Sequence, residues 1–261
     1  MKISIIGAGA MGGAIARGLI DASPEFIESP QDICVSNPHK GKLVPLAELG
    51  CRTTASNREA VAGAELVAVC VKPRLLREVL EEIAPALKTG VHVCVVVAGI
   101  SPEEISKWLT VEGKPVPDHS IAMPNTAMAI RESMTFIVPC KGPCDVTEML
   151  FEQLGAVRVI PFRLLPAATA LASCGIAYAL RYVRAATEGG VQLGFRAAEA
   201  QEIVAQTLIG AAALLLQPGA HPEVEIDKVT TPGGWTIRGL NAMEKEGFTR
   251  AVIEGHIACT R

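Results

Sequence analysis

Three glycines near the start of the chain have the spacing of a dinucleotide-binding turn. Gly7, Gly9 and Gly12 follow the apolar run "KISIIG" and lead into a segment with helical periodicity, Met11 to Ile20. In such a turn the first glycine permits the sharp bend, the second lets the backbone approach a pyrophosphate, and the third lets helix and strand pack closely. The helix N-terminus then offers unpaired N–H groups to the phosphates. Strand, turn and helix together favour a dinucleotide site over an ordinary tight turn.

The second expected strand, residues 32–37, favours NADP over NAD. NAD sites usually carry an acid at the end of this strand, where it binds the ribose 2′-hydroxyl. Here Asp32 opens the strand, and its end carries Ser36 and Asn37, with Lys40 and Lys42 in the following loop. Hydroxyl, amide and cationic groups suit a 2′-phosphate. The alternative is that the lysines belong only to a solvated loop. We expect NADPH as the cofactor, with NADH as the second choice.

The C-terminal part of the chain lacks the usual acid–base residues of carbonyl reduction. No lysine occurs between Lys141 and Lys228, and we expect structural or solvent-facing positions for His221, His256 and Tyr178. An imine needs less acid–base help than a carbonyl, because its nitrogen is readily protonated and the resulting carbon accepts hydride. The absence therefore favours an imine as the substrate.

The run "VTTPGGWTIRGL", residues 229–240, could bind such a substrate. Backbone N–H groups at the start of a helix face an anion such as a carboxylate, and threonine hydroxyls donate or accept hydrogen bonds. The alternative is that Thr231 only caps the helix, with Pro232 at its first position. The residues alone leave both interpretations open.

Short β-branched runs alternate with helix-like segments as far as residue 162, and only helix-like patterns follow. This order predicts an α/β Rossmann-type domain with a doubly wound, mostly parallel sheet over residues 1–162. Residues 163–261 are predicted to form an all-α domain. Its helices are apolar on more than one face, which a domain of about a hundred residues cannot cover alone. We therefore expect a homodimer, or a larger assembly of dimers.

Composition excludes several classes of protein. The net charge is -3 and both signs are scattered, so no nucleic-acid-binding patch is expected. The N-terminal apolar run is broken by glycines and lacks a cleavage site, which excludes a signal peptide, and no other run has the unbroken apolarity of a membrane span. Among eight cysteines, Cys140 and Cys144 lie close together, but no histidine completes a zinc pattern. We expect no metal, no membrane contact, reduced thiols and a cytoplasmic location.

Several motifs occur in an order and spacing that resemble those of the pyrroline-5-carboxylate reductases, over essentially the whole chain. The most specific is the C-terminal signature (S/T)-P-G-G-x-T followed by a helix. The others are "GAGAMG" (7–12), "VKP" (71–73), "AG" (98–99), "MPNT" (123–126), "AY" (177–178), "EGGVQLG" (188–194) and "HP" (221–222).

The resemblance implies NADPH-dependent reduction of 1-pyrroline-5-carboxylate to L-proline, the last step of proline biosynthesis. It implies a site between the cofactor domain and the helical domains of a dimer. Thr236 corresponds to the catalytic threonine that hydrogen-bonds the ring nitrogen. Thr231, Gly233, Gly234 and Trp235 correspond to the substrate carboxylate cradle. The corresponding cofactor-binding positions are Gly7, Gly9, Ala10, Met11, Gly12, Ser36, Asn37, Asn57, Val71, Lys72 and Ala98.

The chain departs from the family pattern on the expected substrate side. Residues 172–176 read A-S-C-G-I where the family commonly has S-G-S-G-P, Ala127 replaces a proline, and residues 131–133 read R-E-S in place of G-E-G. Trp235 stands where a small residue is common. Three interpretations follow: a working reductase that has drifted, a reductase of a related cyclic imine acid, or a non-catalytic NADP(H)-binding regulator on the same fold.

Overall fold

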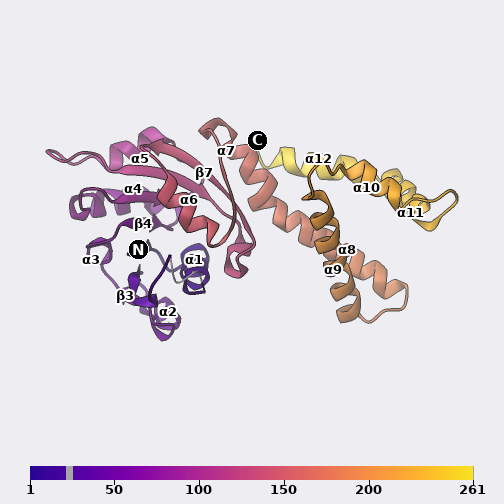
Figure 1. The fold of residues 1–261 in the computed structure, drawn as a ribbon, viewed down its shortest axis with the longest axis horizontal. Helices are drawn as coiled ribbons and strands as arrows, with labels where there is room; N and C mark the ends of the chain where they lie inside the picture. Colours follow the sequence, from indigo (N-terminus) through magenta and orange to yellow (C-terminus); the bar gives the residue numbers. More distant parts are fainter. Residues whose placement is uncertain (22–25, 261) are drawn as a thin grey trace. The chain divides into compact units, whose positions relative to one another are not determined.

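The computed structural model describes residues 1–21 and 26–260, which divide into two compact units (Figure 1). The first unit is Met1–Ser173 and the second is Cys174–Arg261. The last strand ends at Val159 and every later element is helical. The change from strands to helices thus lies close to the predicted boundary at 162/163, whereas the division by packing falls later, between Ser173 and Cys174.

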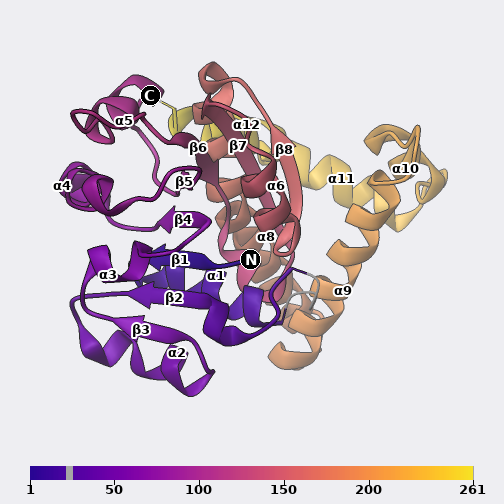
Figure 2. The same cartoon turned by 60° about the vertical axis from the view of Figure 1, so that its left-hand side comes forward.

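An eight-stranded sheet in the order β3-β2-β1-β4-β5-β6-β7-β8 forms the centre of the first unit (Figure 2). All neighbouring pairs are parallel except β6 and β7. The predicted mostly parallel Rossmann sheet is therefore confirmed. The strands are β1 (Ile3–Ile6), β2 (Ile33–Ser36), β3 (Arg52–Thr54), β4 (Leu66–Val69), β5 (His92–Val95), β6 (Asp118–Met123), β7 (Ser133–Lys141) and β8 (Gly155–Val159).

Helices cover both faces of this sheet, and each face has its own apolar core. β1, β2, β4 and β5 are buried along their whole length, which is why these strands are almost uninterrupted apolar runs. One core includes Ile15 and Phe151, and the other includes Leu80 and Ile105. The helices of this unit are α1 (Ala10–Ile20), α2 (Val44–Glu48), α3 (Asn57–Val61), α4 (Pro73–Ile83), α5 (Pro102–Trp108), α6 (Asp145–Glu152) and α7 (Leu165–Ala168).

A buried hydroxyl–imidazole chain connects β5, β6 and α6. His92 Nε2 lies 2.9 Å from Ser120 Oγ, which lies 2.8 Å from Thr147 Oγ1. Burial lowers the pKa of His92 from 6.5 to about 4, because the charged imidazolium is poorly solvated there. His119, on β6, also has its pKa lowered by burial. Both rings are therefore neutral near pH 7.

Acid is expected to destabilise the protein through these two histidines. A depressed folded-state pKa means that the unfolded chain binds the proton first, so stability is full above about pH 6.5 and declines toward pH 4. His92 alone contributes a loss of about 3 kcal/mol over this range. Urea unfolding at several pH values tests this. His92→Gln should flatten the profile, whereas replacing the exposed His39 by Gln should not; equal profiles for all three proteins would contradict the assignment.

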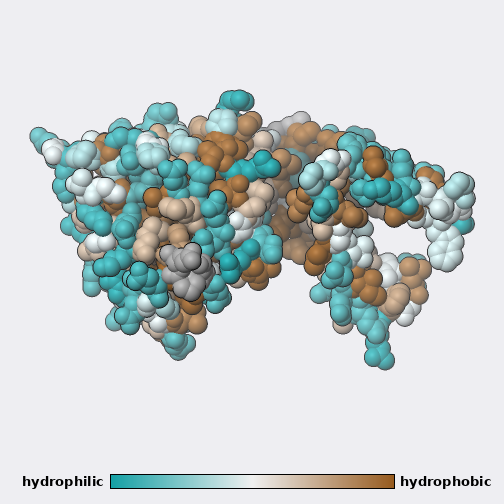
Figure 3. All heavy atoms as spheres, viewed as in Figure 1, coloured by the Kyte–Doolittle hydropathy of each residue, from teal (hydrophilic) through white to brown (hydrophobic). Residues whose placement is uncertain are grey.

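The second unit is a set of helices with almost no buried side chain of its own. They are α8 (Gly175–Gln192), α9 (Ala197–Leu215), α10 (Pro222–Lys228), α11 (Trp235–Lys245) and α12 (Phe248–Ala258). Among the described residues of this unit only Ala200 is buried. Leu193 and Leu216 are each 84% exposed, and apolar residues lie on the surface of these helices (Figure 3). So large an exposed apolar surface marks an interaction face.

The stretch Phe162–Gln192 is helical throughout and includes a six-residue π-helix, Thr169–Cys174. It is the one described helix long and apolar enough to cross a membrane, judged by length and composition. No membrane span was expected from the sequence, because no run beyond the N-terminal one, which glycines interrupt, has the unbroken apolarity of a span. A single helix of this kind also occurs in the cores of soluble proteins, so it does not identify a membrane protein.

Candidate active site

The glycine-rich turn has the geometry that its spacing predicts. Gly7 has φ +103°, and a Cβ atom there would lie 2.5 Å from the carbonyl oxygen of Cys70. A Cβ atom at Gly12 would lie 1.9 Å from the carbonyl oxygen of Gly7. At Gly9 a Cβ atom would meet no protein atom within 4 Å. Gly7 and Gly12 are therefore required by the fold, whereas the space beside Gly9 is open to a ligand.

Gly9 is the N-cap of α1 and has no side chain with which to cap the helix. The first N–H groups of the helix, from Ala10 and Met11 onward, therefore have no capping side chain. An uncapped helix start beside an open glycine fits a pyrophosphate.

The residues at the end of β2 are polar and uncharged, and they belong to a hydrogen-bond network that reaches Glu82 on α4. Ser36 is fully buried and its Oγ donates to Asn57 Oδ1 at 2.7 Å, while Asn57 Nδ2 donates to Glu82 Oε2 at 2.8 Å. Asn37 Oδ1 accepts from the backbone N–H of His39 at 2.9 Å. Asp32 lies outside β2: it ends the 3-10 helix Pro30–Asp32, where it closes a capping box with Ser29, and the strand begins one residue later than expected, at Ile33.

The loop after β2 borders a hollow of about 270 Å³. Lys40 lines it together with Thr53 and Thr54 at the end of β3. The hollow lies beside the strand end at which a Rossmann site holds the adenosine ribose. Lys40 and the Thr53 hydroxyl are suitable groups for a phosphate on that ribose, whereas the Thr54 hydroxyl donates to the carboxylate of Glu59.

Parallel pairing brings the remaining predicted cofactor positions to the same edge of the sheet. β1, β2, β4 and β5 are mutually parallel, so the residues after them share the carboxyl edge. Val71 and Lys72 follow β4, and Lys72 is the N-cap of α4. Ala98 follows β5 and is exposed. The order of the strands reverses between β1 and β4, which is where ligands bind in open α/β sheets.

Two of the residues that depart from the family pattern, Ser173 and Arg131, make hydrogen bonds within the first unit. Ser173 Oγ, at the end of the π-helix, donates to the carbonyl of Pro124 at 3.0 Å. Arg131 is the one described non-glycine residue with positive φ, at 62°. Its guanidinium donates to the carbonyls of Gln153 and Asp21. These bonds hold the backbone of residue 131 in a left-handed conformation, which a glycine adopts without strain.

In the second unit, the "TPGG" run forms a tight turn that ends at α11. The N–H of Gly234 donates to the carbonyl of Thr231 at 2.9 Å, and Gly233, with φ +67°, occupies the third turn position. Proline at the second position and glycine at the third are typical of a type II turn. A Cβ at Gly234 would lie 2.4 Å from Thr231 Oγ1. Both glycines are therefore required by the turn itself.

The alternative that Thr231 caps this helix is wrong. The N-cap is Gly234 and the helix begins at Trp235, so Thr231 is the first residue of the preceding turn. No side-chain capping bond is made at Gly234. Within the described chain, no hydrogen bond is made by the exposed hydroxyls of Thr231 and Thr236. The turn therefore presents two hydroxyls and an uncapped helix start to a ligand.

Trp235 is 87% exposed, so its indole does not pack within its own chain. A side chain this exposed is accessible to a substrate or to another subunit.

Arg238, near the start of α11, contacts this turn and was not singled out from the sequence. Its Nε donates to the carbonyl of Gly234 and its Nη2 to that of Gly233, both at 3.2 Å. The sequence pattern that could have identified it is an arginine near the start of a helix. A cation there opposes the helix dipole, so it needs another reason to be present. The guanidinium fixes the turn and adds positive charge beside it.

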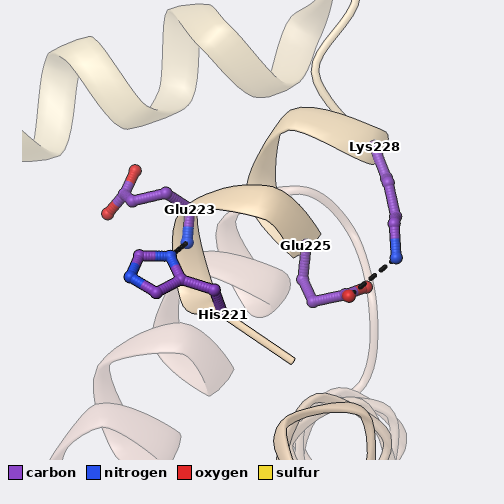
Figure 4. Close-up of polar contacts among 4 residues, drawn as sticks. All are labelled: His221, Glu223, Glu225 and Lys228. Carbon is purple, nitrogen blue, oxygen red and sulfur yellow. Dashed lines mark hydrogen bonds and ion pairs between the residues drawn. The ribbon is translucent and has the colours of Figure 1, made fainter. Parts of the chain in front are cut away.

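The other acid–base candidates have structural roles. His221 caps α10 and accepts from the N–H of Glu223 through Nδ1, beside the Glu225–Lys228 ion pair (Figure 4). Tyr178 hydrogen-bonds the carbonyl of Gly255, and its ring stacks edge-on with His256 at 5.0 Å. The described residues hold no group of three or more metal ligands.

The fold and its carboxyl edge define the class first: a Rossmann-type dinucleotide-binding oxidoreductase with an appended helical domain. The family model described as NADP oxidoreductase coenzyme F420-dependent matches residues 2–108, and the model of the pyrroline-5-carboxylate reductase dimerisation domain matches residues 163–261.

Individual relatives agree with these models. Pyrroline-5-carboxylate reductase 2 of Dictyostelium discoideum is 37% identical over 97% of this chain and 89% of its own length. Pyrroline-5-carboxylate reductase 1 of that organism is 40% identical over 97% of this chain, which spans only 47% of that relative. The solved pyrroline-5-carboxylate reductase of Coxiella burnetii superposes with a TM-score of 0.86 at 28% identity, covering 99% of this chain and 96% of that one. The chain belongs to the pyrroline-5-carboxylate reductase family.

Proposed function

We propose that this protein reduces 1-pyrroline-5-carboxylate to L-proline with NADPH. The observation that carries the proposal is the family relationship, at 37% identity across nearly the whole of both chains. The reduced nicotinamide supplies hydride to the imine carbon when it is bound. The open space at Gly9, the start of α1 and the polar end of β2 would hold its phosphates and ribose.

The turn before α11 supplies the substrate contacts in this proposal. The Thr236 hydroxyl hydrogen-bonds the ring nitrogen, which takes its proton from solvent. Thr231 and the backbone N–H groups of Gly233 and Trp235 bind the carboxylate at the helix start, while the N–H of Gly234 closes the turn onto the Thr231 carbonyl. The remaining cofactor-contacting positions are Gly7, Ala10, Met11, Gly12, Asn37, Asn57, Val71, Lys72 and Ala98.

A homodimer provides the cover that the helical unit lacks. With Ala200 its one buried described residue, this unit cannot hold a core alone. We propose that residues 163–261 form the dimerisation domain and that dimers assemble further. A cytoplasmic location fits eight free thiols. Sedimentation of the full chain tests the dimer, and a stable monomer at micromolar concentration would contradict it.

Consumption of NADPH in the presence of pyrroline-5-carboxylate tests the activity. Turnover with NADPH faster than with NADH is expected, because β2 ends in Ser36, with Asn37 and Lys40 in the loop that follows, where an NAD site usually carries an acid. Tight NADPH binding without turnover would instead identify a non-catalytic regulator.

A related cyclic imine acid is the second candidate substrate, and the exposed indole of Trp235 is the observation that favours it. Trp235→Ala is expected to change the ratio of kcat/KM for the five-membered substrate to that for piperideine-carboxylate, because a bulky side chain beside the turn restricts ring size. An unchanged ratio would leave the indole a subunit contact only. Phe248→Ala removes another exposed aromatic ring of this unit and serves as the control.

Arg238→Ala is expected to raise KM for the imine acid about tenfold, because the turn loses two charge-assisted hydrogen bonds and a nearby positive charge. Arg238→Lys should recover only part of this, since an ammonium cannot bind two carbonyls in the same fork. Arg250→Ala removes the same charge elsewhere in the unit and should leave KM unchanged. Steady-state kinetics on the three variants decides; equal KM values would exclude Arg238 from this role.

A further inference from the structure

Two cysteines of the helical unit lie together on one side of α8. Cys174 immediately precedes α8 and Tyr178 is one turn further on, so both side chains share a face. Cys259, at the end of α12, meets this face: its Sγ lies 2.5 Å from the hydroxyl of Tyr178. Partial burial, and then a side-chain hydrogen bond with Cys259, raise the pKa of the Cys174 thiol. Cys174 and Cys259 therefore both lie beside Tyr178, although 84 residues separate them along the chain.

The other thiols are differently placed. Cys34, Cys51, Cys70, Cys94 and Cys144 are buried and Cys140 is half-buried, whereas Cys259 is exposed. Burial raises the pKa of the Cys51 thiol to about 11 and that of Cys94 to about 12. A protonated, inaccessible thiol is unreactive. An exposed thiol with a second thiol beside it is the arrangement found in reversible oxidation sites.

We propose that Cys174 and Cys259 form a redox-active dithiol that closes to an intrachain disulfide in the presence of a hydroperoxide. The oxidation uses neither Thr236 nor the turn before α11, so it is a reaction separate from the reduction proposed above. Cys174 occupies a position at which the family pattern has a serine.

The chemistry balances with one hydroperoxide. The exposed Cys259 thiolate attacks the peroxide, so that an S–O bond forms, the O–O bond breaks and an alcohol or water leaves. The one proton of the Tyr178 hydroxyl, which points to the Gly255 carbonyl while Cys259 is a thiol, can turn to that thiolate, because a thiolate only accepts. The Cys174 thiolate then attacks the sulfenic sulfur, the S–S bond forms and hydroxide leaves as water. Two thiols lose two electrons, and the hydroperoxide gains them.

Treatment of the full-length protein with hydrogen peroxide tests the proposal. Intact mass under non-reducing conditions should fall by about 2 Da, with the loss reversed by dithiothreitol. Peptide mapping should join the peptide containing Cys174 to that containing Cys259. The disulfide fixes the end of α12 to the start of α8, so the oxidised protein should melt several degrees higher, roughly as expected for a long closed loop.

Matched variants make the outcome decisive. Cys174→Ser and Cys259→Ser should each abolish the mass loss, whereas Cys140→Ser should not. Tyr178→Phe should still form the disulfide, because only the hydroxyl is removed. Three results would overturn the proposal: a disulfide in either single serine variant, a covalent dimer through Cys259, or Cys259 sulfinic acid with Cys174 still reduced.

Discussion

Replacing Thr236 by valine is expected to lower kcat/KM for pyrroline-5-carboxylate about a hundredfold, while NADPH binds as before. Valine has the same shape as threonine but no hydroxyl, so the imine nitrogen loses its hydrogen-bond partner as its charge changes in the transition state. Removing one such donor or acceptor typically costs about two orders of magnitude. Thr236 is exposed at the start of α11, so the substitution should not disturb packing within the chain.

The serine variant separates chemistry from structure. Thr236→Ser keeps the hydroxyl and should retain most of the activity. Thr249→Val is the matched control, because Thr249 is an exposed threonine of the same unit whose hydroxyl bonds Glu244 and has no part in the proposed site. Steady-state kinetics and NADPH titration decide the matter. Activity in Thr236→Val equal to that of the unchanged protein would remove Thr236 from catalysis, and equal losses in the valine and serine variants would indicate a structural effect.

Structural features that depend on the spacing of residues close together in the chain were predicted from the sequence. Features that depend on contacts between distant segments were not. The glycine turn was predicted because the contacts that require its glycines lie within one strand–turn–helix unit. β3 is only three residues long, "RTT", and α10 spans seven residues, so neither has enough periodicity to be recognised. The division after Ser173 falls inside a continuous helical pattern, where composition does not change.

The candidate site shows the same limit. Ser36 and Asn57 were each assigned to the cofactor through the resemblance, but their hydrogen bond and its extension to Glu82 join three separate elements. Thr231 could have been a helix cap or part of a turn until the backbone placed the cap at Gly234. Arg238 binds two carbonyls that precede it by four and five residues, a contact that depends on the turn geometry. Sequence predicts which residues are available, and the folded backbone determines which of them meet.

The glycines of the first turn allow cofactor binding and folding to be separated. Gly9→Ala is expected to weaken NADPH binding about tenfold or more, because the added methyl group would keep the backbone from approaching the pyrophosphate closely. The free energy of unfolding should stay the same or rise slightly, because the new methyl group meets no protein atom and φ at Gly9 is already -78°. Gly12→Ala should instead lower the melting temperature by about 10 °C, because its Cβ would overlap the carbonyl oxygen of Gly7 and force α1 from β1.

Thermal melts and NADPH titration of the two variants, each with and without cofactor, separate the two effects. NADPH should raise the melting temperature of the unchanged protein, since a ligand that binds only the folded state stabilises it, and it should raise that of Gly9→Ala much less. If Gly9→Ala binds NADPH as tightly as the unchanged protein, the open space beside Gly9 is not where the pyrophosphate lies, and the dinucleotide must be held elsewhere along the carboxyl edge. If Gly9→Ala unfolds like Gly12→Ala, then Gly9 is a folding requirement and says nothing about a ligand.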